Sequence, residues 1–323
     1  MQKSGSMMNS VVEVRSVSRS FTPRGGSYAL RDVSLTVEEG QVVALLGVNG
    51  AGKTTLTKII STLLLPTAGQ VTVLGNDVVT NPQNARRQMS VIFGGDKGLY
   101  NRLSGIENLR FFGMLAGVSR SEMKTRLLPM LEEVGLSEAG PKRVETYSKG
   151  MRQRLHIAIG LISRPRVLLL DEPTVGLDPD EAGKLRDTIA RLRKDGVSVL
   201  LTSHYLLDVE RLADRVVMLH AGRVKADMTI QDFAARAGYA AVLTIVIADS
   251  PTNISELPAG VTLDSIRQSF DGYEVVLRLL SWSPAILSAI GGAFATSNVL
   301  DMSVRQAGLE EAFASFAVAG GQE

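Results

Sequence analysis

The segment GVNGAGKTT, at positions 47–55, constrains the fold of this chain more than any other. It fills the pattern G-x-x-x-x-G-K-[ST], follows the apolar stretch QVVALL and opens a segment of helical periodicity. Glycines at this place let backbone N–H groups close around phosphates, and the helix N-terminus adds a dipole that attracts anions. A plain glycine-rich turn does not explain why the motif lies between a strand and a helix. The segment therefore predicts a nucleoside triphosphate site.

The residues of this loop have distinct expected roles. The Lys53 ammonium is expected to reach the β- and γ-phosphate oxygens, and the Thr54 hydroxyl is expected to ligate Mg²⁺. Backbone groups of the remaining residues would surround the phosphates. The predicted cofactor-binding residues of the loop are Gly47, Val48, Asn49, Gly50, Ala51, Gly52, Lys53, Thr54 and Thr55.

A second motif, RVLLLDEPTVGLDP, supplies acidic groups. A buried strand that ends in acids delivers carboxylates to the C-terminal edge of a parallel sheet, beside the phosphate loop. Asp171 is expected to hold Mg²⁺, directly or through water. Glu172 is expected to act as the catalytic base toward the attacking water, because hydrolysis needs a proton acceptor within hydrogen-bond reach. Taken alone, the motif would also fit a strand-end turn followed by an acidic helix cap.

Composition limits the kinds of protein that this chain can be. Hydrophobic residues make up 45% and charged residues 21%, as in folded globular domains, and 323 residues exceed what one hydrophobic core usually organises. The net charge is +2 and the basic residues are spread out, so nucleic-acid binding gains no support. No cysteine is present, which excludes disulfides and thiolate metal sites. The richest apolar runs are about half of the roughly 18 residues that span a bilayer.

Hydrophobic periodicity predicts an α/β core. Residues 11–45 contain three stretches typical of strands, and the segments up to VSVLLTSH alternate apolar strands with helices, as in a parallel sheet with packed helices. Helical periodicity dominates residues 82–164, which predicts a helical subdomain there, although MSVIF at 89–93 is typical of a strand. The predicted first domain covers 1–227, with a mixed sheet, an antiparallel β part and this helical subdomain.

The remaining residues, 228–323, are predicted to form a small α+β accessory domain. The segments AVLTIVIAD, VTLDSI, YEVVLRLL and NVLDMSVRQ are typical of strands, and SPAILSAIGGAF and GLEEAFASFAV are typical of helices. Nothing in these segments indicates a ligand site. A role in dimerisation or regulation is the expectation for this domain.

Three more motifs complete a recognisable series. YSKGMRQRL lies between the two motifs above, GLDP follows the acids, and TSH ends a later strand. In this order, over residues 11–227, the motifs resemble the ATP-binding subunit of an ABC transporter. The resemblance implies ATP and Mg²⁺ as ligands, Ser148 and Gly150 as signature residues, Asp178 in the D-loop and a catalytic His204 in the switch. It also implies an ATP-sandwich dimer, in which the signature of one copy contacts the γ-phosphate bound by the other.

The signature departs from the common L-S-G-G-Q form. Tyr147, Lys149 and Met151 occupy its first, third and fifth positions. The two retained residues, Ser148 and Gly150, are those that face phosphate in the family. A helix that starts at this place would offer N–H groups to an anion, as the phosphate loop does, although a serine here would by itself also fit an ordinary helix cap.

Two other positions are assigned by the resemblance. Phe21 matches the aromatic residue that stacks on adenine, with Tyr28 as a nearby rival and packing in the core as the alternative for Phe21. Gly95, in VIFGGDKGLY, occupies the place of the usual glutamine that contacts Mg²⁺ and the attacking water. Either Asp96 or a water molecule is expected to replace the amide of that glutamine, or communication with the membrane subunit is expected to run through the backbone.

The absence of a predicted membrane span places any transport pore in a separate polypeptide. The C-terminal domain, which ends GLEEAFASF, is similar to that of ATP-binding subunits of ABC-2 type drug and antibiotic exporters, including the daunorubicin-resistance group. This resemblance implies an ABC-2 type permease partner at the cytoplasmic face of the cell membrane. Within the segment 99–117 we expect surface, partner-facing side chains at Tyr100, Asn101 and Arg102, and interior ones at Leu109, Phe112 and Leu115.

Other functions remain open at this point. ATPases of polysaccharide or teichoic-acid exporters also carry C-terminal domains. Soluble ABC ATPases that act on DNA or ribosomes carry long heptad arms or two cassettes, which this sequence lacks. A P-loop kinase would lack the signature, the D-loop and the switch histidine. No nucleic-acid partner is expected.

Overall fold

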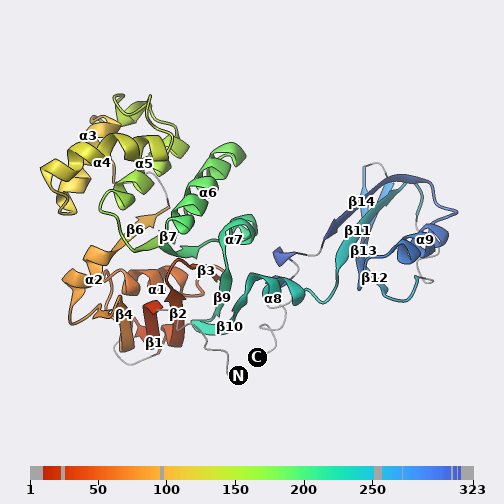
Figure 1. Ribbon diagram of the computed structural model, residues 1–323. Coiled ribbons are helices and arrows are strands. Elements are labelled where there is room, and N and C mark those ends of the chain that lie inside the picture. Colours follow the sequence, from red (N-terminus) through yellow and green to blue (C-terminus); the bar gives the residue numbers. More distant parts are fainter. Residues whose placement is uncertain are drawn as a thin grey trace, which may run out of the picture. The chain divides into compact units, whose positions relative to one another are not determined.

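A computed structural model describes residues 10–22, 26–94, 98–250, 257–270, 272–306, 308–310 and 312–313. The chain divides into two compact units, Met1–Thr229 and Ile230–Glu323 (Figure 1). The nucleotide-site motifs all belong to the first unit, and we describe each unit by itself. Among the residues described, no helix combines the length and the hydropathy needed to cross a membrane.

A six-stranded sheet forms the centre of the first unit. Its strands are parallel except the edge strand β10, which is antiparallel to β9. In order across the sheet they are β10 (Arg223–Thr229), β9 (Arg215–His220), β3 (Val42–Leu46), β8 (Ser198–Thr202), β7 (Val167–Asp171) and β6 (Met89–Phe93). Every residue of β3, β7 and β8 is buried, because both faces of the sheet are covered.

An antiparallel sheet covers one side of this core. Its order is β2 (Tyr28–Glu38), β1 (Ser10–Ser20), β4 (Ala68–Val73) and β5 (Asn76–Asp77). Its buried valines and leucines share one hydrophobic cluster with α1 (Lys53–Ile60) and with β3. The predicted mixed core with an antiparallel β part is confirmed.

Helices cover the opposite face of the six-stranded sheet and share a second hydrophobic cluster with it (Figure 1). These are α3 (Gly105–Leu115), α4 (Arg120–Glu133), a short 3-10 helix η1 (Val144–Thr146), α5 (Lys149–Leu161), α6 (Pro179–Lys194) and α7 (Leu206–Leu212). Ser104 and Ser119 begin α3 and α4, each with a glutamate three residues later in a reciprocal capping box. The range 82–164 also contains α2 (Pro82–Gln88) and β6. Because β6 pairs with β7, that part of the range belongs to the sheet.

The prediction for the interior of α3 was partly wrong. Leu109 is fully buried and Phe112 is partly buried, but Leu115 is 75% exposed. An α-helix turns about 100° per residue, so Leu115 lies roughly 120° around the helix from Leu109. Apolar residues spaced three and six positions after Leu109 therefore lie progressively farther from the buried face of α3.

The second unit is a four-stranded antiparallel sheet with helices. The order is β12 (Val261–Ser269), β13 (Gly272–Leu279), β11 (Ala241–Ile247) and β14 (Val299–Gln306). Two helices, α8 (Ile230–Ala235) and α9 (Pro284–Ala293), accompany it, and α9 packs its Ile290 against the central strands. The predicted α+β class is confirmed. The predicted terminal helix GLEEAFASFAV lies largely outside the described residues.

Candidate active site

The phosphate loop joins β3 to α1 in a conformation that requires glycine. Gly52, at the start of α1, has a φ of 107°, which lies in the left-handed region. A Cβ added there would lie 2.6 Å from the carbonyl oxygen of Ala29. A Cβ on Gly47 would lie 2.4 Å from the carbonyl oxygen of Leu219. The backbone of the loop is thus held tightly against two strands while its N–H groups surround an anion-binding position.

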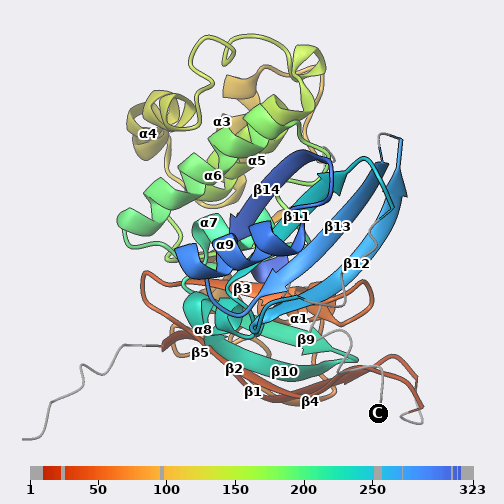
Figure 2. The ribbon, with the colours of Figure 1, turned by 90° about the vertical axis from the view of Figure 1, so that its right-hand side faces the viewer.

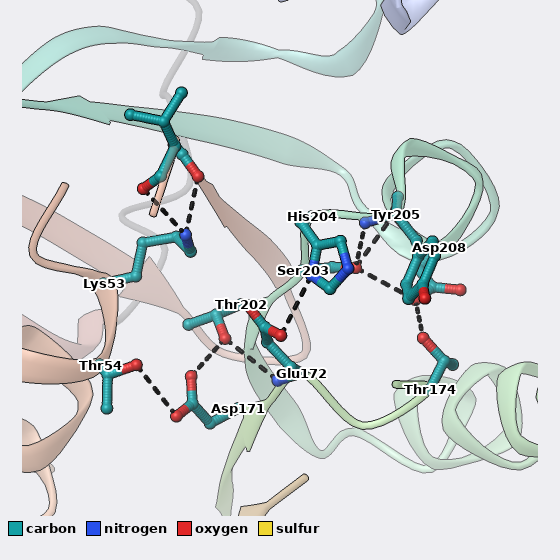
Figure 3. Close-up of polar contacts among 12 residues, drawn as sticks. Lys53, Thr54, Asp171, Glu172, Thr174, Thr202, Ser203, His204, Tyr205 and Asp208 are labelled. Carbon is teal, nitrogen blue, oxygen red and sulfur yellow. Dashed lines mark hydrogen bonds and ion pairs between the residues drawn. The ribbon is translucent and has the colours of Figure 1, made fainter. Parts of the chain in front are cut away.

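Lys53 crosses the interior of this loop. Its Nζ donates to the carbonyl oxygens of Gly47 at 2.7 Å and Val48 at 3.3 Å (Figure 3). The side chain is almost fully buried. Burial lowers the pKa of Lys53 from its usual range, and the nearby Glu172 and Asp171 carboxylates oppose that shift. The loop therefore holds a cation where phosphate oxygens would bind.

Two oxygen ligands meet beside the loop. The Thr54 hydroxyl donates to Asp171 Oδ2 at 3.2 Å, and Asp171 Oδ1 accepts from the Thr202 hydroxyl (Figure 3). Asp171 ends β7 and is only 8% exposed. One carboxylate and one hydroxyl, open to added phosphate and water oxygens, are a donor set that suits Mg²⁺. Thr202, the last residue of β8, escaped prediction, although its place as the first residue of TSH is the signal that could have identified it.

Glu172 follows Asp171 in a strained backbone conformation. Its φ is 52°, which is unusual for a non-glycine residue and recurs at functional sites. Its N–H donates to the carbonyl and hydroxyl oxygens of Thr202 at 3.0 and 3.1 Å. Its Oε2 lies 3.0 Å from Nδ1 of His204, whose ring stacks on Tyr205 with 4.2 Å between centroids. The structure therefore brings together the predicted base and the predicted switch histidine.

A buried polar cluster lies behind this pair. Asp208, on α7, is 0% exposed and accepts from Arg186 at 2.8 Å, from Ser203 at 3.1 Å and from the Thr174 hydroxyl. Thr174 follows β7, and Ser203 follows β8. One carboxylate thus joins the two loops that carry Glu172 and His204. No sequence pattern had indicated this residue, since an isolated aspartate in an amphipathic helix is ordinarily exposed.

The signature and D-loop residues lie at the starts of two helices. Ser148 caps α5 and accepts from the Met151 N–H at 3.1 Å, and Asp178 caps α6 and accepts from the Glu181 N–H at 2.9 Å. A Cβ on Gly150 would lie 2.3 Å from Oε2 of Glu181, so glycine permits this close approach. Within the part of the chain that the structure describes, no hydrogen bond links these residues to the phosphate loop.

Comparison with known proteins gives the family. The model for "ABC transporter" domains matches residues 30–175. The ABC transporter ATP-binding protein NatA of Bacillus subtilis is 44% identical over 196 residues, which cover 61% of this chain and 80% of NatA. The chain belongs to the ABC transporter ATP-binding proteins. The daunorubicin resistance ATP-binding protein DrrA3 of Streptomyces coeruleorubidus is 39% identical over 76% of this chain and 78% of its own length.

Other relatives and solved structures agree. The doxorubicin resistance ATP-binding protein DrrA of Mycobacterium tuberculosis is 44% identical over 67% of this chain and 65% of its own length. An ATP-binding subunit of an ABC transporter superposes with a TM-score of 0.63 at 35% identity, covering 71% of this chain and 93% of that one. A dimeric ATP-binding cassette with ADP and Pi superposes at 0.61 and 26% identity, covering 68% and 98%. This ABC protein is therefore a nucleotide-binding ATPase.

The two aromatic residues considered for adenine stacking are exposed. Phe21 is 61% exposed with the Arg19 guanidinium 4.8 Å from its ring centroid, and Tyr28 is 37% exposed with Arg31 at 5.3 Å. Packing of Phe21 in the core, the alternative considered from sequence, is therefore wrong. Both rings remain open to an adenine base.

Gly94 joins β6 to the acidic end of β7. Its N–H donates to the carbonyl oxygen of Asp171 at 2.6 Å, and a Cβ built on it would lie 2.4 Å from the carbonyl oxygen of Glu172. A cavity of about 640 Å³ opens here, lined by Thr54, Lys58, Leu63, Phe93, Gly94, Lys149, Asp171, Glu172 and Val175. Gly95, predicted to take the place of the family's glutamine, lies outside the described residues. The first glycine of the pair has a clear structural reason: it lets β6 end against the backbone of the acidic pair.

Replacing Gly94 with Ala is expected to lower steady-state ATP hydrolysis by about 10- to 100-fold, because displacing a catalytic group by ~1 Å can cost that much. The added Cβ would push on the backbone of Glu172, which has no flexible end that can move aside. Gly183→Ala is the matched control, since no atom lies within 4 Å of a Cβ at that position in α6. Equal activity of the two variants in a phosphate-release assay would contradict the proposed contact.

Proposed function

We propose that this chain is the ATP-hydrolysing subunit of an ABC-2 type exporter, which powers the movement of a drug, antibiotic or other hydrophobic compound through a separate membrane subunit. The observation that carries the catalytic part is the Glu172–His204 contact beside the Thr54–Asp171 pair. Support for the cargo class comes from the names of relatives, two of which are a daunorubicin and a doxorubicin resistance ATP-binding protein.

Each side chain has a chemical role in this proposal. Lys53 binds β- and γ-phosphate oxygens, and Thr54 and Asp171 hold Mg²⁺, which neutralises phosphate charge when bound. Glu172 accepts a proton from water as the water oxygen attacks the γ-phosphorus and the bond to the β-phosphate oxygen breaks. His204 orients the Glu172 carboxylate through Nδ1. The products are ADP and inorganic phosphate.

A second copy of the chain completes the site in this proposal. Ser148 and Lys149, at the start of α5, are exposed, and a helix N-terminus favours an anion such as the γ-phosphate of the facing copy. Asp178 begins α6 and would lie near the same interface. The similarity to a dimeric cassette bound to ADP and Pi supports this arrangement.

The membrane subunit is proposed to dock beside β6 and α3. A cavity of about 850 Å³ there is lined by residues of α2, β6, α3 and α5, among them Arg86, Phe112 and Leu115. Exposed apolar side chains extend this surface: Phe93, Tyr100, Phe111, Met114 and Leu115. Such a patch is typical of a protein–protein contact. Docking would hold the chain at the cytoplasmic face of the membrane. Tyr100, Asn101 and Arg102 are exposed in the chain alone and would face the membrane subunit.

Leu115→Asp is expected to reduce stimulation of ATP hydrolysis by the membrane subunit roughly fivefold or more and to leave basal hydrolysis unchanged, because a charge would be buried in an apolar contact. The measurement uses the chain copurified with its membrane subunit, which is to be sought in the adjacent reading frames. Leu65→Asp is the control, because Leu65 is 59% exposed and does not line the cavity. Full stimulation of Leu115→Asp, or an equal loss in both variants, would exclude this docking surface. Lack of any neighbouring membrane protein would count against transport itself.

A further inference from the structure

The edge strand β14 of the C-terminal unit is open to pairing. It lies at one end of the sheet order, opposite β12, and within the described residues no strand pairs with its outer side (Figure 2). All eight of its residues, Val299–Gln306, are exposed. An exposed strand edge presents a row of unpaired N–H and C=O groups that another strand can use. Natural proteins usually protect such an edge with proline, lysine or a bulge. β14 contains neither proline nor lysine, and its one irregularity lies at Leu300, beside its first residue.

The opposite edge, β12, is interrupted closer to its middle. The pairing of β12 with β13 shifts between Leu263 and Ser265, and Asp264 of β12 forms an ion pair with Arg278 of β13. The pairing of β14 with β11 also shifts once, between Val299 and Asp301, but it continues without a shift from Asp301 to Gln306. Of the two edges, β14 therefore has the longer stretch that pairs without a shift, Asp301–Gln306 against Ser265–Ser269 of β12.

The apolar face of the sheet continues onto β14. Its register with β11 places Met302 beside Ile245 and Val304 beside Leu243, on the face against which α9 packs. Met302 and Val304 are nevertheless 47% and 43% exposed, whereas Ile245 and Leu243 are fully buried. One helix of ten residues covers the middle of the sheet and leaves an apolar margin along this edge.

We propose that β14 pairs antiparallel with β14 of a second copy of this chain, about a two-fold axis through Ser303, to form a continuous eight-stranded sheet. When the two-fold axis is perpendicular to the sheet, the apolar faces of the two copies lie on the same side only if the axis passes through a residue. That residue then lies opposite its own copy. With Ser303 on the axis, Asp301 lies opposite Arg305 of the second copy on one face. Met302 lies opposite Val304 of the second copy on the apolar face. Each of these pairs occurs twice.

Neighbouring registers lack this match. An axis through Met302 would place Asp301 opposite Ser303, and an axis through Val304 would place Arg305 opposite Ser303. Opposite charges and apolar side chains directly across a strand pair are favourable. The edge is smaller than a standard interface, so we expect a weak contact that strengthens nucleotide-dependent dimers by raising effective concentration. This contact does not depend on the proposed transport function.

Disulfide trapping tests the pairing in the full-length chain without nucleotide. Because the sequence contains no cysteine, Ser303→Cys introduces a single thiol on the proposed axis. Directly opposed residues of antiparallel strands have Cα atoms at about 4.5–5.5 Å, within the range of a disulfide. Ser303→Cys is expected to form covalent dimers about tenfold faster under mild oxidation than Thr262→Cys, an exposed thiol on the opposite edge strand. Equal rates would overturn the proposal.

Charge reversal tests the register. Asp301→Arg in the Ser303→Cys chain would place like charges opposite each other and is expected to slow cross-linking about tenfold. Adding Arg305→Asp restores opposite charges and should restore the rate of cross-linking. If either change acted only by disturbing the structure of the unit, the second change would not restore that rate. No slowing, or no rescue, would exclude this register. A segment of the same chain lying on β14 would keep Ser303→Cys monomeric and would also overturn the proposal. Since ATP hydrolysis is not the readout, failure here leaves the catalytic proposal standing.

Discussion

Glu172→Gln is expected to lower steady-state ATP hydrolysis by about 10²- to 10⁴-fold, the usual contribution of a general base. The amide has nearly the same shape as the carboxylate but cannot accept the proton of the attacking water. The backbone hydrogen bonds of Glu172 to Thr202 do not involve the side chain, so the loop should keep its conformation. ATP binding, measured by equilibrium titration, should remain near that of the wild type, while phosphate release should fall.

The matched control is Glu210→Gln, an exposed glutamate on α7. It removes one negative charge close to the same region but makes no contact with the Thr54–Asp171 pair. We expect wild-type hydrolysis from this control. Turnover of Glu172→Gln within about threefold of the wild type would show that another group accepts the proton.

Asp208→Ala is expected to destabilise the protein by about 3–5 kcal/mol, because breaking a buried ion pair leaves an uncompensated charge. Arg186 would lose its carboxylate partner, and the hydroxyls of Thr174 and Ser203 would lose their shared acceptor. For a domain of this size such a loss corresponds to a melting temperature lower by roughly 6–20 °C. Thermal unfolding by calorimetry or circular dichroism measures it.

Asp187→Ala provides the comparison for this change. Asp187 is adjacent to Arg186 on α6 but exposed, and surface substitutions of this kind usually change stability by less than about 0.5 kcal/mol. We expect its melting temperature to match that of the wild type. If the two variants have the same melting temperature, the hydrogen bonds and ion pair of Asp208 do not contribute to stability.

The main chemical groups of the site could be predicted because each belongs to a short motif of neighbouring residues. Lys53 and Thr54 follow from a glycine-rich loop between strand and helix, and Asp171 and Glu172 follow from an apolar strand that ends in acids. These relationships span only a few residues. Both motifs follow the C-terminal ends of parallel strands, so they meet at the same edge of the sheet, as the Thr54–Asp171 hydrogen bond shows.

Other parts depend on contacts between distant segments. Thr202 and Asp208 lie 31 and 37 positions beyond Asp171. Thr202 belongs to the TSH motif, but no local pattern predicts its hydrogen bond to Asp171, and none marks the buried Asp208 carboxylate as a member of the site. Leu115 was misassigned to the interior because the face of a helix that is buried depends on what packs against it. The close approach of Gly94 to Glu172 likewise requires two strands to lie side by side.

The family, the nucleotide chemistry and the class of both units could be read from the amino-acid sequence, because glycine-rich turns, strand-end acids and hydrophobic periodicity are properties of neighbouring residues. The folded arrangement was needed to identify the side chains that support the acidic pair, the apolar residues that remain exposed and the edge strands of each sheet. Those properties depend on burial, and burial depends on packing between segments that are far apart in the chain.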